Sequence, residues 1–159
     1  MNKLESLYRA FRHRIFEYVM RMTGDYELSR DIMQESFARY FERYGDMEVK
    51  PSLLYRIARN IIFDTFRKNS RKKYPNDLDQ GSENNAEHQI LVREEYRLVM
   101  EAMKVLHPED REILSLSISG DLSYRDIAAI TNISEGNIKV KIHRARLKLK
   151  KSLKACEES

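Results

Sequence analysis

Apolar residues in the first part of the chain recur at steps of three and four, the period of a helix that buries one face. Two stripes of this kind are separated by Gly24 and Asp25, which are suited to end one helix and to cap the next. Pro51 favours the first position of a third helix. The pattern therefore predicts helices over residues 4–22, 28–44 and about 51–72.

Helical periodicity returns in the last part of the chain, with the signals of a helix-turn-helix. Ser123 and Asp126 have capping-box spacing, and Asn132 suits a left-handed turn residue. Ser134 is expected to cap a longer basic helix. The predicted helices run over about residues 92–106, 108–119 and 123–131, and from residue 134 onward.

The segment between these parts has no apolar periodicity and is rich in turn formers. Residues 73–92 contain one basic residue, Lys73, and four acidic residues, at positions 77, 79, 83 and 87. This composition is typical of a flexible linker. The sequence therefore predicts an all-α fold of two small helical domains, at residues 1–73 and 92–159, joined by an acidic linker at residues 74–91.

Composition excludes several classes of protein. The 159 residues have a net charge of +4 and a single cysteine, Cys156, which excludes an internal disulfide and a cysteine-based zinc site. The longest uncharged run, Ile113–Gly120, is far shorter than the ~20 residues of a membrane span. Glycine-rich phosphate loops and hydrolase or metalloprotease motifs are missing. We therefore expect an intracellular protein without a cofactor, a metal or enzymatic activity.

The last predicted helix is the first candidate site. Between Lys139 and Lys154 there are eight basic residues and no acidic ones. A solvated face would explain the basic run alone, but the capped helix and turn before it favour DNA. Side chains near the start of such a helix can contact base edges and phosphates. The candidates are Asn137, Lys139, Val140, Lys141, His143 and Arg144.

The third predicted helix has cations interleaved with Tyr55, Phe63 and Phe66, a combination suited to single-stranded nucleic acid. Burial in the core explains each of these aromatic residues equally well. The second predicted helix instead has a mixed-charge face, which suits a protein partner or only water.

Three segments resemble conserved regions of one family. Residues 31–37 (DIMQESF) resemble the core-polymerase-binding segment of bacterial sigma factors of the extracytoplasmic-function (ECF, group IV) type. Residues 54–64 (LYRIARNIIFD) resemble the −10 element segment of that family. Residues 122–128 (LSYRDIA) and 138–146 (IKVKIHRAR) resemble its −35 helix-turn-helix.

The resemblance implies a promoter-recognition subunit with no enzymatic activity. Its implied partners are core RNA polymerase, through the β′ clamp helices and the β flap, promoter DNA, and an anti-sigma factor. The implied location is cytoplasmic, at the nucleoid or held at the inner membrane face by the anti-sigma factor.

The resemblance also implies which residues make these contacts. The implied polymerase-binding residues are Asp31, Gln34, Glu35 and Arg39. Those for −10 DNA are Tyr55, Arg56, Arg59, Asn60, Asp64, Arg67 and Lys68. Those for −35 DNA are Ser134, Asn137, Lys139, Val140, Lys141, His143 and Arg144.

The sequence departs from the family at a few positions. Residues 52–54 stand where the family often has tryptophan, Asn132 where it often has glycine, and Val140 where it often has serine. Two other hypotheses remain open: a free-standing helix-turn-helix regulator whose first domain senses a ligand or dimerises, and an enzyme that acts on nucleic acid. The basic third helix, predicted over about residues 51–72, favours a sigma factor over the regulator, since a sensor domain has no need of such a helix.

Overall fold

The computed structural model describes residues 2–45, 49–69 and 97–158. Within these ranges the regular structure is helical and contains no strand, which confirms the all-α prediction. The chain divides into two compact units, Met1–Gln80 and Gly81–Ser159. The predicted acidic linker lies outside the described residues.

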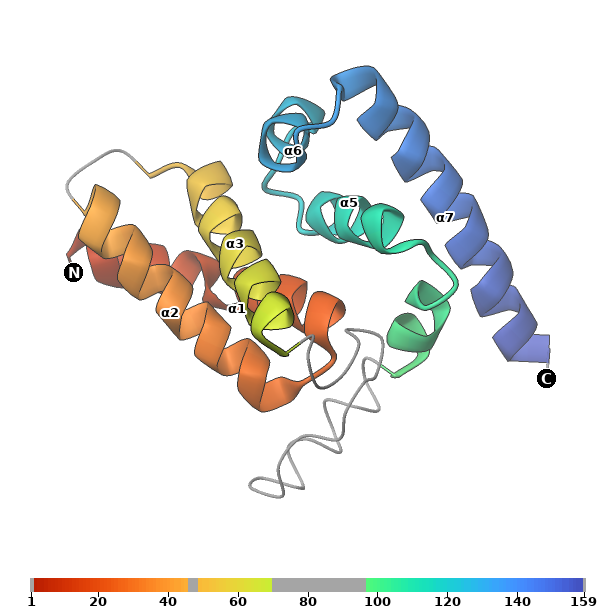
Figure 1. Cartoon of the computed structure of the whole chain (residues 1–159), viewed down its shortest axis with the longest axis horizontal. Coiled ribbons are helices and arrows are strands. Elements are labelled where there is room, and N and C mark those ends of the chain that lie inside the picture. The colour runs from red at the N-terminus through yellow and green to blue at the C-terminus, as the bar shows by residue number, and fades with distance from the viewer. Residues whose placement is uncertain (1, 46–48, 70–96, 159) are drawn as a thin grey trace. The chain divides into compact units, whose positions relative to one another are not determined.

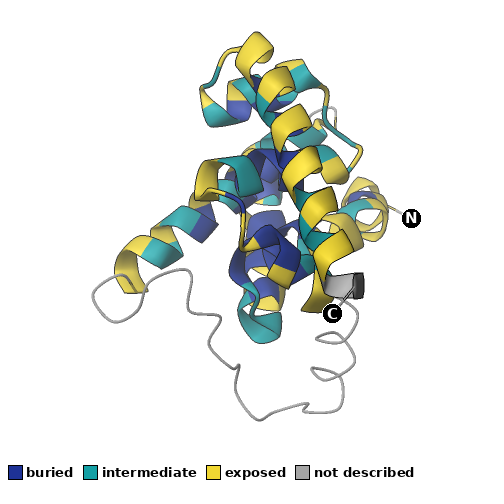
Figure 2. Ribbon diagram, turned by 90° about the vertical axis from the view of Figure 1, so that its right-hand side faces the viewer, coloured by how far each residue is buried: buried dark blue, intermediate teal, exposed yellow. Residues whose placement is uncertain are grey.

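The first unit is a bundle of three helices, α1 (Lys3–Thr23), α2 (Tyr26–Tyr44) and α3 (Pro51–Asn69), each in contact with the other two (Figure 1). The three apolar stripes meet in one core that includes Ile15 of α1, Phe37 of α2 and Ile62 of α3. The faces of the three helices that point away from this core are exposed (yellow in Figure 2). The predicted extension of α3 toward residue 72 lies outside the described residues.

The turn between α1 and α2 has the predicted caps. Gly24 adopts a left-handed conformation (φ 70°) and its N–H donates to the Met20 carbonyl, which ends α1. The Asp25 side chain accepts from the Leu28 N–H (3.1 Å) and caps α2. The two caps leave a turn of only two residues, Gly24 and Asp25, between α1 and α2.

Two contacts define how α2 ends and α3 begins. A Cβ on Gly45 would lie 2.7 Å from the Phe41 carbonyl oxygen, so the chain passes too close there for a side chain. The buried Tyr40 accepts a hydrogen bond from the Lys50 N–H (3.2 Å) through its hydroxyl, next to the start of α3 at Pro51. Tyr40 thereby ties the start of α3 to the middle of the bundle.

The second unit consists of helical residues 97–103, α5 (Pro108–Ile118), α6 (Tyr124–Thr131) and α7 (Glu135–Glu158) (Figure 1). Met103, Leu106, Leu114 and Ala145 form a buried cluster against which Val99 and Leu149 pack. Arg111 of α5 donates from Nε to the Met103 carbonyl (3.2 Å), and burial lowers the pKa of this guanidinium. The cluster holds α7 against α5.

Helices α6 and α7 form the predicted helix-turn-helix. Both hydrogen bonds of the Ser123–Asp126 capping box are present. Asn132 adopts the left-handed conformation (φ 61°) that Asn tolerates better than most residues. The Ser134 hydroxyl then accepts from the Asn137 N–H (3.3 Å) at the start of α7.

Replacing Ser123 with alanine should destabilise the second unit by about 1 kcal/mol, because α6 loses the N-cap hydrogen bond to Asp126. Urea unfolding of the full chain, followed by circular dichroism, measures the change. Ser6→Ala is the control, since Ser6 is exposed on α1 and its hydroxyl makes no cap. Equal stability of the Ser123→Ala and Ser6→Ala variants would contradict the role given to the capping box.

Candidate nucleic-acid interfaces

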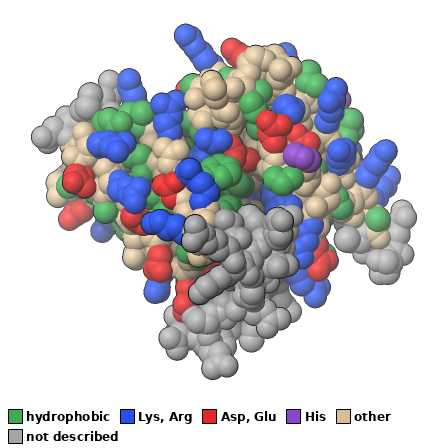
Figure 3. Space-filling model, viewed as in Figure 1, with side chains coloured by type: hydrophobic (Ala, Val, Ile, Leu, Met, Phe, Trp, Pro, Cys, Tyr) green, Lys and Arg blue, Asp and Glu red, His purple; other side chains and the backbone are tan. Residues whose placement is uncertain are grey.

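The outer face of α7 is exposed and basic. Ile138, Ile142 and Ala145 are fully buried and fix the inward face of the helix. Lys and Arg side chains line the edge of the second unit formed by α7 (blue in Figure 3). Exposed residues on α7 include five of the predicted −35 residues, namely Asn137, Lys139, Val140, His143 and Arg144.

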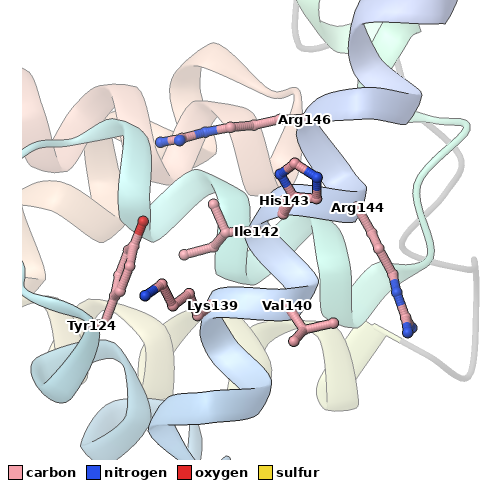
Figure 4. A pocket seen from close by; sticks show the side chains of 7 residues that line it. All are labelled: Tyr124, Lys139, Val140, Ile142, His143, Arg144 and Arg146. Atoms are coloured by element: carbon pink, nitrogen blue, oxygen red, sulfur yellow. The ribbon is translucent and has the colours of Figure 1, made fainter.

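An open pocket of about 400 Å³ lies between α6 and α7. Figure 4 shows Lys139 and Arg146 extending from α7 toward the side on which Tyr124 stands, while Arg144 extends to the opposite side. Tyr124 and Arg146 were not predicted as site residues. Arg146 follows His143 by three residues and Lys139 by seven, so the three residues lie on one side of a helix. This spacing could have identified Arg146 from the sequence.

Two predicted −35 residues have partners within the protein. The Ser134 hydroxyl is engaged at the start of α7, although the residue is exposed. The Lys141 ammonium lies 2.9 Å from Glu109 Oε2 and 3.9 Å from Asp110 Oδ1, both at the start of α5. Lys141 therefore faces α5 rather than the outer face of its helix.

The outward face of α3 is also basic and is separate from its buried stripe. Arg59 lies over the ring of the half-buried Phe63, with 4.7 Å from the guanidinium carbon to the ring centroid. Arg67 pairs with Asp64 at 2.5 Å. Exposed on this helix are the predicted −10 residues Arg56, Asn60, Asp64, Arg67 and Lys68, and Arg59 is half-buried.

Tyr55 was wrongly placed among the DNA-contacting residues. Its side chain is 0% exposed and packs edge-to-face on Tyr18 of α1, with ring centroids 5.6 Å apart. The spacing of Tyr55 to the buried Ala58 and Ile62, three and seven residues later, is the signal that it belongs to the core stripe. Phe63 and Phe66 are half-buried and lie between core and surface.

The mixed-charge face of α2 lies opposite the buried Ile32, Met33 and Phe37. Arg39 pairs with Glu35 one turn earlier (2.6 Å), and about half of each side chain is exposed. All four predicted polymerase-binding residues, Asp31, Gln34, Glu35 and Arg39, are exposed.

Neither a metal site nor a membrane span is found in the part of the chain that the structure describes. No group of three or more His, Cys, Asp or Glu side chains there could hold a metal ion. None of the helices there is long and apolar enough to cross a bilayer.

Comparison with known proteins assigns both units to one family. Residues 7–72 match the family model of sigma-70 region 2, and residues 96–149 match that of sigma-70 region 4. The ECF RNA polymerase sigma factor SigM of Bacillus subtilis is 30% identical, over 92% of this chain and 93% of its own length. The chain belongs to the ECF family of RNA polymerase sigma factors. The resemblance inferred from the sequence is thus confirmed.

A further relative and two solved structures are also similar to this sigma factor. SigW of Bacillus subtilis is 26% identical over 91% of this chain and 85% of its own length. The sigma factor RpoE of Bartonella quintana, solved in complex with the anti-sigma factor NepR, matches with a TM-score of 0.73 and 18% identity, over 97% of this chain and 98% of that one. CnrH, solved with the cytosolic domain of CnrY, matches with a TM-score of 0.72 and 19% identity, over 96% and 88% of the two chains.

Proposed function

We propose that this sigma factor joins core RNA polymerase and selects promoters by contacting −35 duplex DNA with α7 and melted −10 DNA with α3. The observation that supports this most directly is that two basic helices, each with a buried apolar stripe, are present in two separate units. A regulator with one helix-turn-helix needs only the second of them. The proposed domains are residues 1–73 and 92–159, with residues 74–91 as linker.

For the −35 element, α7 enters the major groove with its amino-terminal half. Lys139, His143 and Arg144 are exposed in that half and can reach base edges or phosphates. Val140 is 46% exposed between them, so it offers an apolar contact, such as one to a thymine methyl group. Tyr124 and Arg146, on either side of the pocket, are suited to hold the adjacent phosphate backbone.

For the −10 element, the outward face of α3 holds the melted strand. Exposed cations follow the phosphates, while Asn60 and Asp64 offer hydrogen bonds to an unstacked base. Arg59, which lies over the ring of Phe63, places a further cation beside them. Tyr55 supports α3 from the core and takes no part in the contact.

For core polymerase, the exposed charged face of α2 docks on the β′ clamp helices, and the second domain contacts the β flap. An anti-sigma factor is a further proposed partner, since both structural neighbours named above were solved in complexes, RpoE with an anti-sigma factor. We propose a cytoplasmic location at the nucleoid, or at the inner membrane face when an anti-sigma factor holds the chain.

Size-exclusion chromatography with core RNA polymerase tests this function, alongside a duplex-DNA binding assay. The full chain should co-elute with core polymerase and should bind duplex DNA only weakly alone. Tight, specific DNA binding without polymerase association would instead favour the free-standing regulator.

The same experiment tests the face of α2. Asp31→Ala combined with Gln34→Ala should weaken polymerase binding on the order of tenfold or more, as expected for central interface residues. Glu17→Ala is the matched control, because Glu17 is an exposed charge on α1 of the same bundle. Equal binding by the two variants would mean that α2 does not contact the polymerase.

A further inference from the structure

Lys141 lies on the opposite side of α7 from Lys139, at the edge of the helix next to Arg144. At about 100° per residue, Lys139 and Lys141 point about 200° apart around the helix. Lys139 extends toward α6 and lines the pocket with Tyr124 (Figure 4), whereas Lys141 meets the first turn of α5. The two lysines, although only two residues apart in sequence, therefore have different neighbours.

The contacts of Lys141 join two helices that are distant in sequence. Its ammonium donates to Glu109 Oε2 at 2.9 Å, across 32 positions of the chain, and lies 3.9 Å from Asp110 Oδ1. The Lys141 side chain is only 28% exposed, and that of Asp110 only 18%. The Glu109 side chain is 48% exposed, so the contact is partly shielded from solvent by the two helices.

The local charge opposes a phosphate contact. Two carboxylates face the single ammonium of Lys141, so the charge at this contact is negative, although the exposed Arg144 and Lys148 lie one and two turns farther along the same side of α7. A DNA phosphate at Lys141 would lie close to both carboxylates and would be repelled by them. The hydrogen bond to Glu109 uses one of the three N–H donors of Lys141 and holds the ammonium on the side of α5.

We propose that Lys141 does not contact DNA but positions α7 by tying it to Glu109 and Asp110 of α5. The pair adds to the buried face of α7 in holding the rotation of this helix on α5, and with it the direction in which Lys139, Val140 and Arg144 face the major groove. This inference rests on the proposed −35 contact of α7. It replaces the DNA-contacting role that the sequence predicts for Lys141.

The dependence of DNA binding on salt separates the two roles. Holoenzyme is assembled from core polymerase and the full chain, and its affinity is measured against salt concentration on a promoter selected from randomised duplexes by the wild-type holoenzyme. Each lost phosphate contact lowers the slope of log K against log salt by about 0.9. Lys139→Met should show that decrease, whereas Lys141→Met should keep the wild-type slope.

Specificity tests the positioning role directly. Lys141→Met should lower the preference for the selected −35 element over a scrambled one by about three- to tenfold, a coupling typical of contacting residues. Glu109→Gln combined with Asp110→Asn should cause the same loss, since it removes the partners of Lys141. Lys141→Arg, which keeps the charge pair, should restore most of the preference.

Three results would overturn the inference: a Lys141→Met slope lowered as much as that of Lys139→Met, a Lys141→Met variant with unchanged preference, or stronger DNA binding by the Glu109→Gln/Asp110→Asn variant. The last would mean that the carboxylates had been masking a DNA-contacting lysine. Failure of the proposed function is distinguishable, because the wild-type holoenzyme itself would then show no preference for any −35 element.

Discussion

Replacing both Lys139 and Arg144 with alanine is expected to abolish transcription from −35-dependent promoters while polymerase binding is retained. Both side chains are exposed in the amino-terminal half of α7 and extend to opposite sides of the helix (Figure 4). They can therefore contact DNA on both sides of the groove. Each such contact contributes about 1–3 kcal/mol. The double variant should therefore lose promoter affinity on the order of a hundredfold or more.

In vitro transcription from the selected promoter measures this loss, and co-elution with core polymerase measures the retained function. Lys148→Ala combined with Lys154→Ala is the matched control, because it removes two exposed charges farther along α7. That control should retain much more activity. If the Lys139→Ala/Arg144→Ala variant no longer co-eluted with polymerase, the separation of DNA-binding and polymerase-binding surfaces would be wrong.

The caps that delimit the helices could be predicted because their chemistry is local. Gly24 and Asp25 act within one turn of the chain, and so do Ser123 and Asp126. Asn132 stands where the family often has glycine, and its left-handed conformation shows how this chain keeps the turn. Such signals depend on neighbours in sequence, so a single sequence contains them.

The individual side chains at the candidate sites were harder to predict, because their environment depends on other helices. Tyr55 is amphipathic and suits either a base or a core. Its spacing to Ala58 and Ile62 favours the core, and its contact with the buried Tyr18 of α1 decides between the two. Lys141 belongs to a run of basic residues that contains no acidic residue, and its partner Glu109 is 32 positions away. A charge pattern along one helix contains no information about the carboxylates of another.

The same difference between local signals and contacts with other helices explains why the sequence predicts Lys139, but not Tyr124, as a site residue. Lys139 could be found from its place near the start of a basic helix. Tyr124 begins α6, which has few charges, and becomes part of the proposed interface only because α6 packs on α7 and leaves a pocket between them. The helix-turn-helix signal predicts the two helices but not which residues of the first one face the groove.

Replacing Asn60 and Asp64 with alanine should block promoter opening without affecting −35 binding or polymerase binding. Both side chains are exposed on the outward face of α3, in the other unit from α7. Unstacking a base costs a few kcal/mol, and hydrogen bonds from these residues would offset part of that cost. We expect the rate of opening to fall on the order of tenfold to a hundredfold, as measured with a fluorescent base analogue in the −10 element.

The Asp64–Arg67 ion pair requires its own control. Asp64→Ala also removes the ion pair with Arg67, although a pair this exposed contributes little to stability. Asn60→Ala alone leaves the pair intact, and Arg67→Ala alone removes it while keeping the Asp64 carboxylate. If base capture is the function of this face, Asn60→Ala must slow opening by itself, whereas Asn69→Ala, another exposed asparagine of α3, must not. Normal opening by the Asn60→Ala/Asp64→Ala variant would exclude these residues from the −10 contact and leave α3 with phosphate contacts only.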